Sequence, residues 1–148
     1  MNLSDNERRQ GFLDALGRSG IPTTSAPMIT ELHDESAAQA ALTRLLQSDE
    51  PPTAIFSAQN LITVGALHAL REEQRQQSIA LVGFDDLPLA DLVEPGVTVI
   101  AQHPHEIGRL AVERLFARLE GDESPASHTV VPTTLIVRGS GEIRPLAE

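Results

Sequence analysis

Apolar positions along this chain alternate between two patterns, the spacing of an amphipathic helix and short continuous runs. The helical spacing predicts helices over residues 4–18, 35–48, 60–73 and 104–121. The short runs predict strands over residues 27–32, 54–58, 79–82 and 97–101, and a last extended pair over 129–138 that Pro132 interrupts. Strands that alternate with helices indicate right-handed crossovers. We therefore expect an α/β fold, a three-layer parallel sheet covered by helices on both faces.

Particular residues set the start and the inward face of these elements. Asn60 suits the cap position of the helix that follows it, and Pro104 suits the first position of the last helix. The helix after Asn60 is apolar around much of its surface, through Leu61, Val64, Ala66, Leu67 and Leu70. The helix has more apolar surface than one core-facing side requires, and deep burial and a subunit interface explain this equally well.

Polar residues follow two of the predicted strands. Asp85 and Asp86 end the run S-I-A-L-V-G-F-D-D, and Gln59 follows strand 54–58. Ligands of open α/β sheets bind at the carboxyl ends of the strands, so we expect at least one aspartate to face a ligand. The other could cap the short turn that follows. Gln59 is open to a pocket contact or a structural role.

Other residues are weaker candidates for a functional role. Arg8 and Arg9 fit a solvated pair, although an arginine in a cleft would offer a rigid fork of donors. His103 and His105 stand two positions apart and do not share a helix face, so we expect no metal site. The glycine spacing matches no phosphate or dinucleotide loop, and no nucleophile stands beside a base. We therefore expect no cofactor and no enzyme, a small hydrolase at Asp85 and Asp86 being the weakest hypothesis.

The composition limits the classes of partner that the chain can bind. The 148 residues are 41% hydrophobic and 22% charged, which is typical of one globular domain, and there is no cysteine for a disulfide or thiolate site. A net charge of −10 without a basic face predicts that this chain does not bind DNA by itself. No apolar run is long enough for a bilayer, and the first residues lack a signal-peptide core, which predicts a cytoplasmic location without membrane partners.

Several motifs follow one another in a familiar order. They are R-R-Q-G-F, P-T-A-I-F-S-A-Q-N-L-I-T-V-G-A-L, L-V-G-F-D-D, E-I-G-R-L-A-V-E-R-L and T-T-L-I-V-R-G-S. Together they resemble the C-terminal part of LacI/GalR-family transcriptional repressors, whose regulatory core is similar to periplasmic sugar-binding proteins. The resemblance covers nearly the whole chain.

The resemblance implies a set of effector-binding positions. Arg8, Gln59 and Asp85 match residues that contact the effector in the family, and Leu32 falls where many members place a stacking aromatic. The helix from Leu61 to Leu70 matches one at the dimer interface. Gln59-Asn60 stands in place of the usual Asn-Asp pair, which removes one negative charge from the pocket edge.

The resemblance also implies an incomplete domain organisation. Residues 1–100 correspond to the C-terminal effector-binding subdomain without its first strand, 101–128 to a helix and loop of the other subdomain, and 129–148 to crossover strands and tail. The helix-turn-helix headpiece is absent. The helix from about Pro104 to Leu119 would then pack on this chain's own sheet, pack on a second copy, or stay exposed. We expect a homodimer that is less stable than a complete core.

The leading hypothesis is the effector-sensing and dimerising part of a LacI-type repressor, with operator DNA bound only through the absent headpiece. Its ligand would be a small sugar, polyol or nucleoside whose binding shifts the population of closed states. The alternative is a stand-alone solute-binding protein without a regulatory role.

Overall fold

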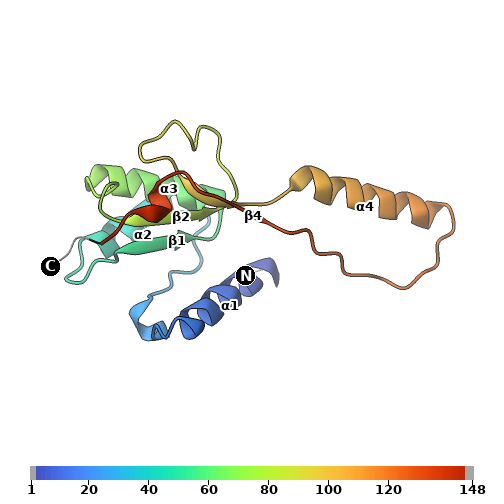
Figure 1. Cartoon of the computed structure of the whole chain (residues 1–148), viewed down its shortest axis with the longest axis horizontal. Coiled ribbons are helices and arrows are strands. Elements are labelled where there is room, and N and C mark those ends of the chain that lie inside the picture. Colours follow the sequence, from blue (N-terminus) through green and yellow to red (C-terminus); the bar gives the residue numbers. More distant parts are fainter. Residues whose placement is uncertain (1–2, 146–148) are drawn as a thin grey trace.

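The computed structural model describes residues 3–145, and Figure 1 shows a sheet-containing body from which one helix projects. The elements in chain order are α1 (Leu3–Arg18), η1 (Thr23–Ser25), α2 (Glu35–Leu46), β1 (Ala54–Ser57), α3 (Asn60–Glu72), β2 (Ala80–Phe84), β3 (Thr98–Ala101), α4 (Pro104–Leu119), β4 (Thr134–Ile136) and η2 (Ser140–Glu142). Within the described range, no helix has both the length and the apolar character that a membrane span requires.

The four strands form one sheet in the order β1-β2-β3-β4. β1, β2 and β3 are parallel, as predicted, and β4 runs antiparallel to β3. The antiparallel strand returns from α4 to the edge of the sheet, which is the difference from the expected all-parallel arrangement. The α/β class is confirmed.

Helices α2 and α3 cover one face of the sheet and contain most of the core. The buried cluster on this face includes Leu42, Leu70, Leu81 and Val99. Gly65 lets the two helices approach closely, because a Cβ built there would lie 2.3 Å from the carbonyl oxygen of Glu35. The packing of α2 on α3 therefore depends on one residue without a side chain.

On the opposite face lie η2 and, in contact through a few side chains, α1. Ile55 packs against the core on the α2–α3 side. Phe56, the next residue of β1, stacks instead on Phe12 of α1, with ring centroids 5.8 Å apart. Successive strand residues point to opposite faces, so α1 lies across the sheet from α2 and α3. Gly141 of η2 lies against Thr98 on this second face, completing the three layers.

The C-terminal segment is tied into the sheet by buried polar groups. The Ser140 hydroxyl donates to the Leu81 carbonyl at 2.6 Å and accepts from the Thr98 amide at 2.9 Å. The Thr98 hydroxyl accepts from the Arg138 amide at 3.0 Å. These bonds satisfy groups that would otherwise be buried without partners, and they lock η2 to β2 and β3.

Two predicted extended segments differ from the structure. Residues 27–32 are irregular, and of the segment 129–138 only Thr134–Ile136 is a strand. A strand needs a neighbour for its amides and carbonyls. β1 is the outer strand on its side of the sheet, and residues 27–32 do not pair with its free edge. The predicted tail also includes residues 146–148, which lie outside the described residues.

The predicted helices are confirmed with small shifts in their ends. α4 begins at Pro104, as predicted, and ends at Leu119 rather than at Gly121. The cap of α3 is one residue earlier than predicted, because Gln59 occupies the N-cap position and Asn60 is already helical. The Asn60 side chain instead accepts a hydrogen bond from the amide of Leu61 at 2.8 Å.

Helix α4 stays exposed, one of the three arrangements expected for it. It projects away from the sheet in Figure 1, and none of its residues is buried. Its exposed apolar side chains are Ile107, Val112, Leu115, Phe116 and Leu119. The last of these is 72% exposed, so the apolar face of α4 contributes nothing to the core.

Candidate functional site

Asp85 lies where β2 ends, at the carboxyl edge of the sheet. Its backbone is left-handed, with φ 71°, and its amide donates to the Ile100 carbonyl at 3.0 Å. Its carboxylate accepts a hydrogen bond from Nε2 of Gln102, the first residue beyond β3. Asparagine and aspartate tolerate this conformation better than other side chains, so a position that requires it favours an aspartate.

Asp86 has a different partner from its neighbour. Its two carboxylate oxygens accept from the Arg138 guanidinium at 2.7 and 2.8 Å, and Oδ1 also accepts from the Leu87 amide at 2.9 Å. The hydrogen bond from Arg138 lowers the pKa of Asp86 below its ordinary value of 3.8. Asp86 therefore joins the C-terminal segment to the end of β2, and Asp85 is the aspartate left for a ligand.

Gln59 lies at the same edge as Asp85. Ser57 and Gly83 are register partners in β1 and β2, so residues two positions further along each strand reach the same level. The Gln59 carbonyl accepts from the amide and hydroxyl of Thr63 at 2.9 and 3.0 Å, while its side chain forms no cap bond. Its backbone thus starts α3, and its amide side chain is available at the strand end.

Arg8 of α1 lies beside the second face of the sheet. Its guanidinium carbon is 4.7 Å from the centroid of the Phe84 ring, a cation–π geometry. The side chain also borders a cavity of about 360 Å³ between α1 and the sheet. The remaining wall of this cavity is formed by Gly11, Phe12, Ala15, Phe56, Phe84, Ile100 and Thr133. Arg9, by contrast, is exposed.

Gln102 is the site residue that sequence analysis missed. It completes a row with Gln59 and Asp85, each located just beyond the end of one parallel strand. The signal was present, because a polar residue after a predicted strand is what identified the other two.

Leu32 is placed apart from this row. It is half-buried in the irregular segment before α2 and is not among the residues that line the cavity. Gln59 and Asp85 are also not among the lining residues, so Arg8 is the predicted ligand contact that borders the cavity, while Gln59 and Asp85 share the carboxyl edge of the sheet.

The residues predicted for a dimer interface divide between core and surface. Ala66 and Leu70 are 4% and 2% exposed and belong to this chain's own core. Leu61 is 44% exposed, and Val64 and Leu67 are half-buried. Leu67 also packs against the core cluster, so Leu61 and Val64 are the predicted interface residues that lie outside the core.

The histidines have separate surroundings. His103 Nε2 lies 2.9 Å from the Thr134 hydroxyl, and His105 is exposed in the first turn of α4. Among residues 3–145, no three His, Asp or Glu side chains gather in a way that could hold a metal ion. The strand-end row offers amide donors and carboxylate and amide acceptors, a set that suits a ligand with several hydroxyls.

Comparison with known proteins gives the relatives of this chain. A family model described as a periplasmic binding protein-like domain matches residues 2–141. The HTH-type transcriptional repressor CytR of Escherichia coli (strain K12) is 30% identical over 140 residues, which make up 93% of this chain and 41% of that protein. The HTH-type transcriptional regulator PtxS of Pseudomonas aeruginosa PAO1 is 36% identical over 137 residues, 90% of this chain and 39% of that protein.

A solved structure supports the same relationship. A LacI family transcriptional regulator from Arthrobacter sp. FB24, in complex with lactose, is 30% identical with a TM-score of 0.66, over 74% of this chain and 42% of that one. The chain spans about two fifths of the length of the curated relatives it matches.

Proposed function

The chain belongs to the family of periplasmic binding protein-like domains, and from this membership we propose that it is the effector-sensing part of a LacI-type transcriptional regulator. Its ligand would be a small hydroxyl-rich molecule, a sugar, polyol or nucleoside. The observation that carries this proposal is the row of Gln59, Asp85 and Gln102 at the carboxyl edge of the sheet. Ligands of open α/β sheets bind at such edges.

The chemistry of the row supports a hydroxyl-rich ligand. An ionised aspartate only accepts hydrogen bonds, so Asp85 can take two ligand hydroxyls, while the amides of Gln59 and Gln102 can donate and accept. Arg8 adds donors at the side of α1. The regulator from Arthrobacter binds lactose, and this chain shares its fold and 30% of its sequence over the matched part.

The division of the chain into domains is part of the proposal. We infer that residues 1–100 and 129–148 form one lobe of a two-lobed sensor, and that 101–128, with α4, belong to the other. The exposed apolar face of α4 supports this division, because a face of that kind is normally covered. Ligand binding between the lobes would change their closure and, in the intact protein, the affinity for operator DNA.

The remaining roles are inferred in the same way. The relatives are named as regulators, which favours a regulatory, non-enzymatic role over a stand-alone solute-binding protein. A regulator of this kind works in the cytoplasm. We propose a homodimer through Leu61, Val64 and Leu67 on α3, the part of that helix that reaches the surface.

Ligand-induced stabilisation tests the proposal. The melting temperature of the chain is measured with lactose, monosaccharides, polyols and nucleosides, in the parent and in Asp85→Asn. A ligand that binds only the folded state raises the melting temperature. We expect Asp85→Asn to weaken its binding by about tenfold or more, the effect of losing a hydrogen bond to a charged group.

Asp49→Asn is the matched control, because Asp49 is exposed and precedes β1, at the opposite end of that strand from the strand-end row. It should leave the ligand response unchanged. Equal responses of the parent and Asp85→Asn, or no response to any ligand class, would refute the proposed site.

A further inference from the structure

A buried pair of hydroxyl groups adjoins the strand-end row. Ser57 is the last residue of β1 and Thr63 lies in the first turn of α3, and their hydroxyl oxygens are 2.6 Å apart. Ser57 is 3% exposed and Thr63 is fully buried. Gln59, a predicted ligand contact, lies between them in the chain. Polar groups at this depth are normally all hydrogen-bonded, so the partners of this pair are informative.

The hydrogen bonds of the pair have one possible direction. Thr63 Oγ1 donates to the Gln59 carbonyl at 3.0 Å, and the Thr63 amide donates to the same oxygen at 2.9 Å. A hydroxyl has one hydrogen, so Thr63 must accept the hydrogen bond from Ser57. Thr63 therefore holds the Gln59 carbonyl twice. These bonds keep Gln59 extended, with φ −153° and ψ 152°, where the strand end passes into α3.

The same threonine side chain also lies against β2. Gly83 is the register partner of Ser57, and a Cβ built on it would lie 2.9 Å from both Oγ1 and Cγ2 of Thr63. The threonine thus occupies the space that a side chain on Gly83 would need. Asp85 follows Gly83 by two residues, just as Gln59 follows Ser57 by two. Thr63 therefore touches both strands at the level just before the two predicted ligand contacts.

We propose that Thr63 is a positioning residue that sets the spacing between Gln59 and Asp85 at the carboxyl edge of the sheet. The proposal rests on the proposed function for the role of these two residues as ligand contacts. The Thr63 hydroxyl fixes the backbone of Gln59, and its methyl group fills the space beside Gly83. Hydrogen bonds weaken steeply away from their preferred geometry, so the spacing decides which ligand hydroxyls can bind both residues.

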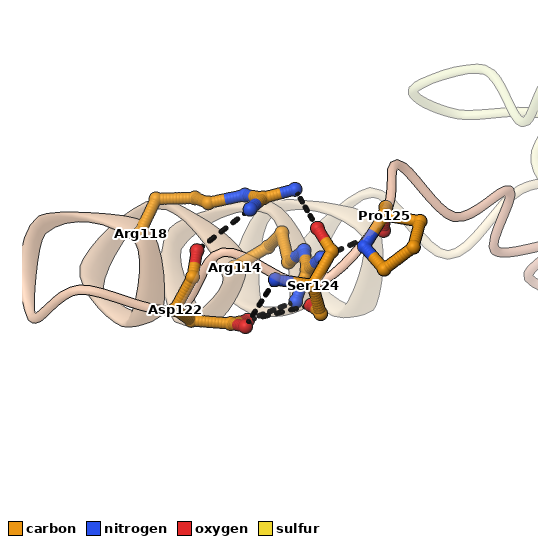
Figure 2. A network of polar contacts seen from close by, with 5 residues as sticks. All are labelled: Arg114, Arg118, Asp122, Ser124 and Pro125. Carbon is orange, nitrogen blue, oxygen red and sulfur yellow. Dashed lines mark hydrogen bonds and ion pairs between the residues drawn. The ribbon is translucent and has the colours of Figure 1, made fainter.

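An exposed polar network elsewhere in the chain provides the contrast. It lies in an arm formed by α4 and its flanking segments, residues 102–133. Figure 2 shows the far end of this arm, where Arg114 donates to the Asp122 carboxylate at 2.5 Å and to the Ser124 hydroxyl at 2.8 Å. Arg118 donates to the carbonyls of Asp122 and Ser124. Ser124 is exposed, so water can replace a partner lost there.

Water has no access to the fully buried Thr63. Removing its hydroxyl leaves the Ser57 hydroxyl without its acceptor and takes one of two donors from the Gln59 carbonyl. Buried groups left in this way are costly, so the surrounding backbone must shift to find other partners. The backbone that can shift is the end of β1 and the start of α3, where Gln59 lies.

Two backbone peptides report this geometry in the absence of ligand. The dipeptides Gln59-Asn60 and Asp85-Asp86 each occur once in the chain. Cell-free synthesis with ¹³C-carbonyl glutamine and ¹⁵N-asparagine therefore gives one crosspeak in a carbonyl-to-amide correlation spectrum. Aspartate labelled with both isotopes gives one crosspeak for the second peptide. Each peak is sensitive to hydrogen bonding and backbone geometry at one predicted ligand contact.

Three substitutions of Thr63 separate the two parts of its side chain. Thr63→Val removes the hydroxyl and should move the Gln59-Asn60 peak. Thr63→Ser removes the methyl group, so it should leave that peak in place and move the Asp85-Asp86 peak. Thr63→Ala removes both groups and should move both peaks. Far-UV circular dichroism should stay unchanged in all three variants.

Two controls remove hydroxyl groups away from the strand ends. Thr43→Ala changes a half-buried threonine in the last turn of α2, which leads toward the opposite end of β1. Ser124→Ala removes the exposed hydroxyl of the network in Figure 2. Both controls should leave the two peaks at their parent positions.

Gly83→Ala tests the same contact from the side of β2. The added Cβ must displace Thr63, so the Gln59-Asn60 peak should move although the substitution is in another strand. This variant keeps the proposal testable if a Thr63 variant does not fold. Unmoved peaks in Thr63→Ala, or an unmoved Gln59-Asn60 peak in Gly83→Ala, would overturn the proposal. Movement of the Gln59-Asn60 peak alone in Thr63→Ala would make Thr63 a local support of α3 and would also overturn the spacing role.

Ligand-induced stabilisation distinguishes failure of this proposal from failure of the proposed function. Thr63→Ala should weaken the binding of a ligand that stabilises the parent by about tenfold, the effect of one lost or misdirected hydrogen bond, while Thr43→Ala should not. Peaks that move as expected while no ligand class stabilises the parent would refute the sensing site and retain the spacing role. A ligand that stabilises parent and Thr63→Ala equally would support sensing and contradict positioning by Thr63.

Discussion

At the scale of single residues, the two adjacent carboxylates of Asp85 and Asp86 have different hydrogen-bond partners. Asp85 belongs to the strand-end row and accepts a hydrogen bond from Gln102, while Asp86 forms a bidentate ion pair with Arg138. The left-handed backbone of Asp85 turns the chain at this point. The strand-end position predicted that at least one aspartate would face a ligand, and only the family resemblance pointed to Asp85. The local pattern could not separate the two aspartates, because Arg138, the partner of Asp86, is 52 residues away.

The ion pair of Asp86 predicts a pH-dependent contribution to stability. Arg138 lowers the pKa of Asp86 below 3.8 in the folded state, so the unfolded chain binds this proton more readily. The contribution is therefore complete above the unfolded pKa and is lost as the pH falls through the lowered folded value. We expect Asp86→Asn to reduce the free energy of unfolding by about 1 kcal/mol at pH 7, a modest value because water screens the partly exposed pair.

Urea unfolding of the parent and Asp86→Asn at pH 7 and at acidic pH measures this difference. The two proteins should converge in stability below the folded pKa. Asp49→Asn, at an exposed position between α2 and β1, is the control. A difference between parent and Asp86→Asn that persists undiminished in acid would show that the carboxylate acts through something other than its charge.

At the scale of elements, similar helical patterns lead to different environments. Helix α3 is buried against α2 through Ala66 and Leu70, whereas α4 exposes Leu115 and Phe116. Periodicity identifies an apolar face and cannot say what covers it. Residues 27–32 show the same limit, since their strand-like composition has no paired strand beside it.

The packing of α2 on α3 predicts that Gly65→Ala is destabilising. The added Cβ would lie 2.3 Å from the Glu35 carbonyl oxygen and 2.7 Å from the Ala38 Cβ, so the helices must separate. We expect a loss of about 1–3 kcal/mol in the free energy of unfolding, the usual range for overpacking. Chemical denaturation monitored by circular dichroism gives the value.

Gly108→Ala in α4 is the matched control, because a Cβ there meets nothing within 4 Å. Alanine favours a helix over glycine by up to about 1 kcal/mol, so this variant should raise the helicity of α4. Equal losses of stability for both variants would contradict the packing described for Gly65.

The isolation of α4 predicts weak protection of its amides. Helices of its length, 16 residues, are marginally stable in water without tertiary packing. Hydrogen exchange followed by mass spectrometry should therefore show fast exchange over 104–119 and slow exchange over β2 and β3. Protection of α4 equal to that of β3 would mean that another surface covers its apolar face.

At the scale of the whole molecule, the chain is a three-layered body with a projecting arm (Figure 1). This shape leaves two apolar surfaces that could support association. One is the exposed part of α3 around Leu61, and the other is the apolar face of α4 around Phe116. The proposed dimer uses the first, which also continues a helix anchored in the core.

Substitutions on the two surfaces distinguish them. Leu61→Glu places a charge on the α3 surface and should convert a dimer to a monomer, because an unpaired charge in an interface is strongly unfavourable. Phe116→Glu should leave the mass unchanged. Sedimentation velocity at several concentrations measures both, and the reverse pattern would place the interface on α4.

The sequence by itself determined the α/β class, the four long helices and three of the four strands, while Arg8, Gln59 and Asp85 stay predicted ligand contacts that come from its family resemblance. These features follow from local pattern, since helix spacing, apolar runs and polar strand ends are each contained in a few consecutive residues. Tertiary structure alone decided the antiparallel course of β4, the division of α3 between core and surface, the pairing of Asp86 with Arg138 and the place of Gln102 beside Asp85. Each of these depends on residues distant in the chain, and only the folded backbone brings them together.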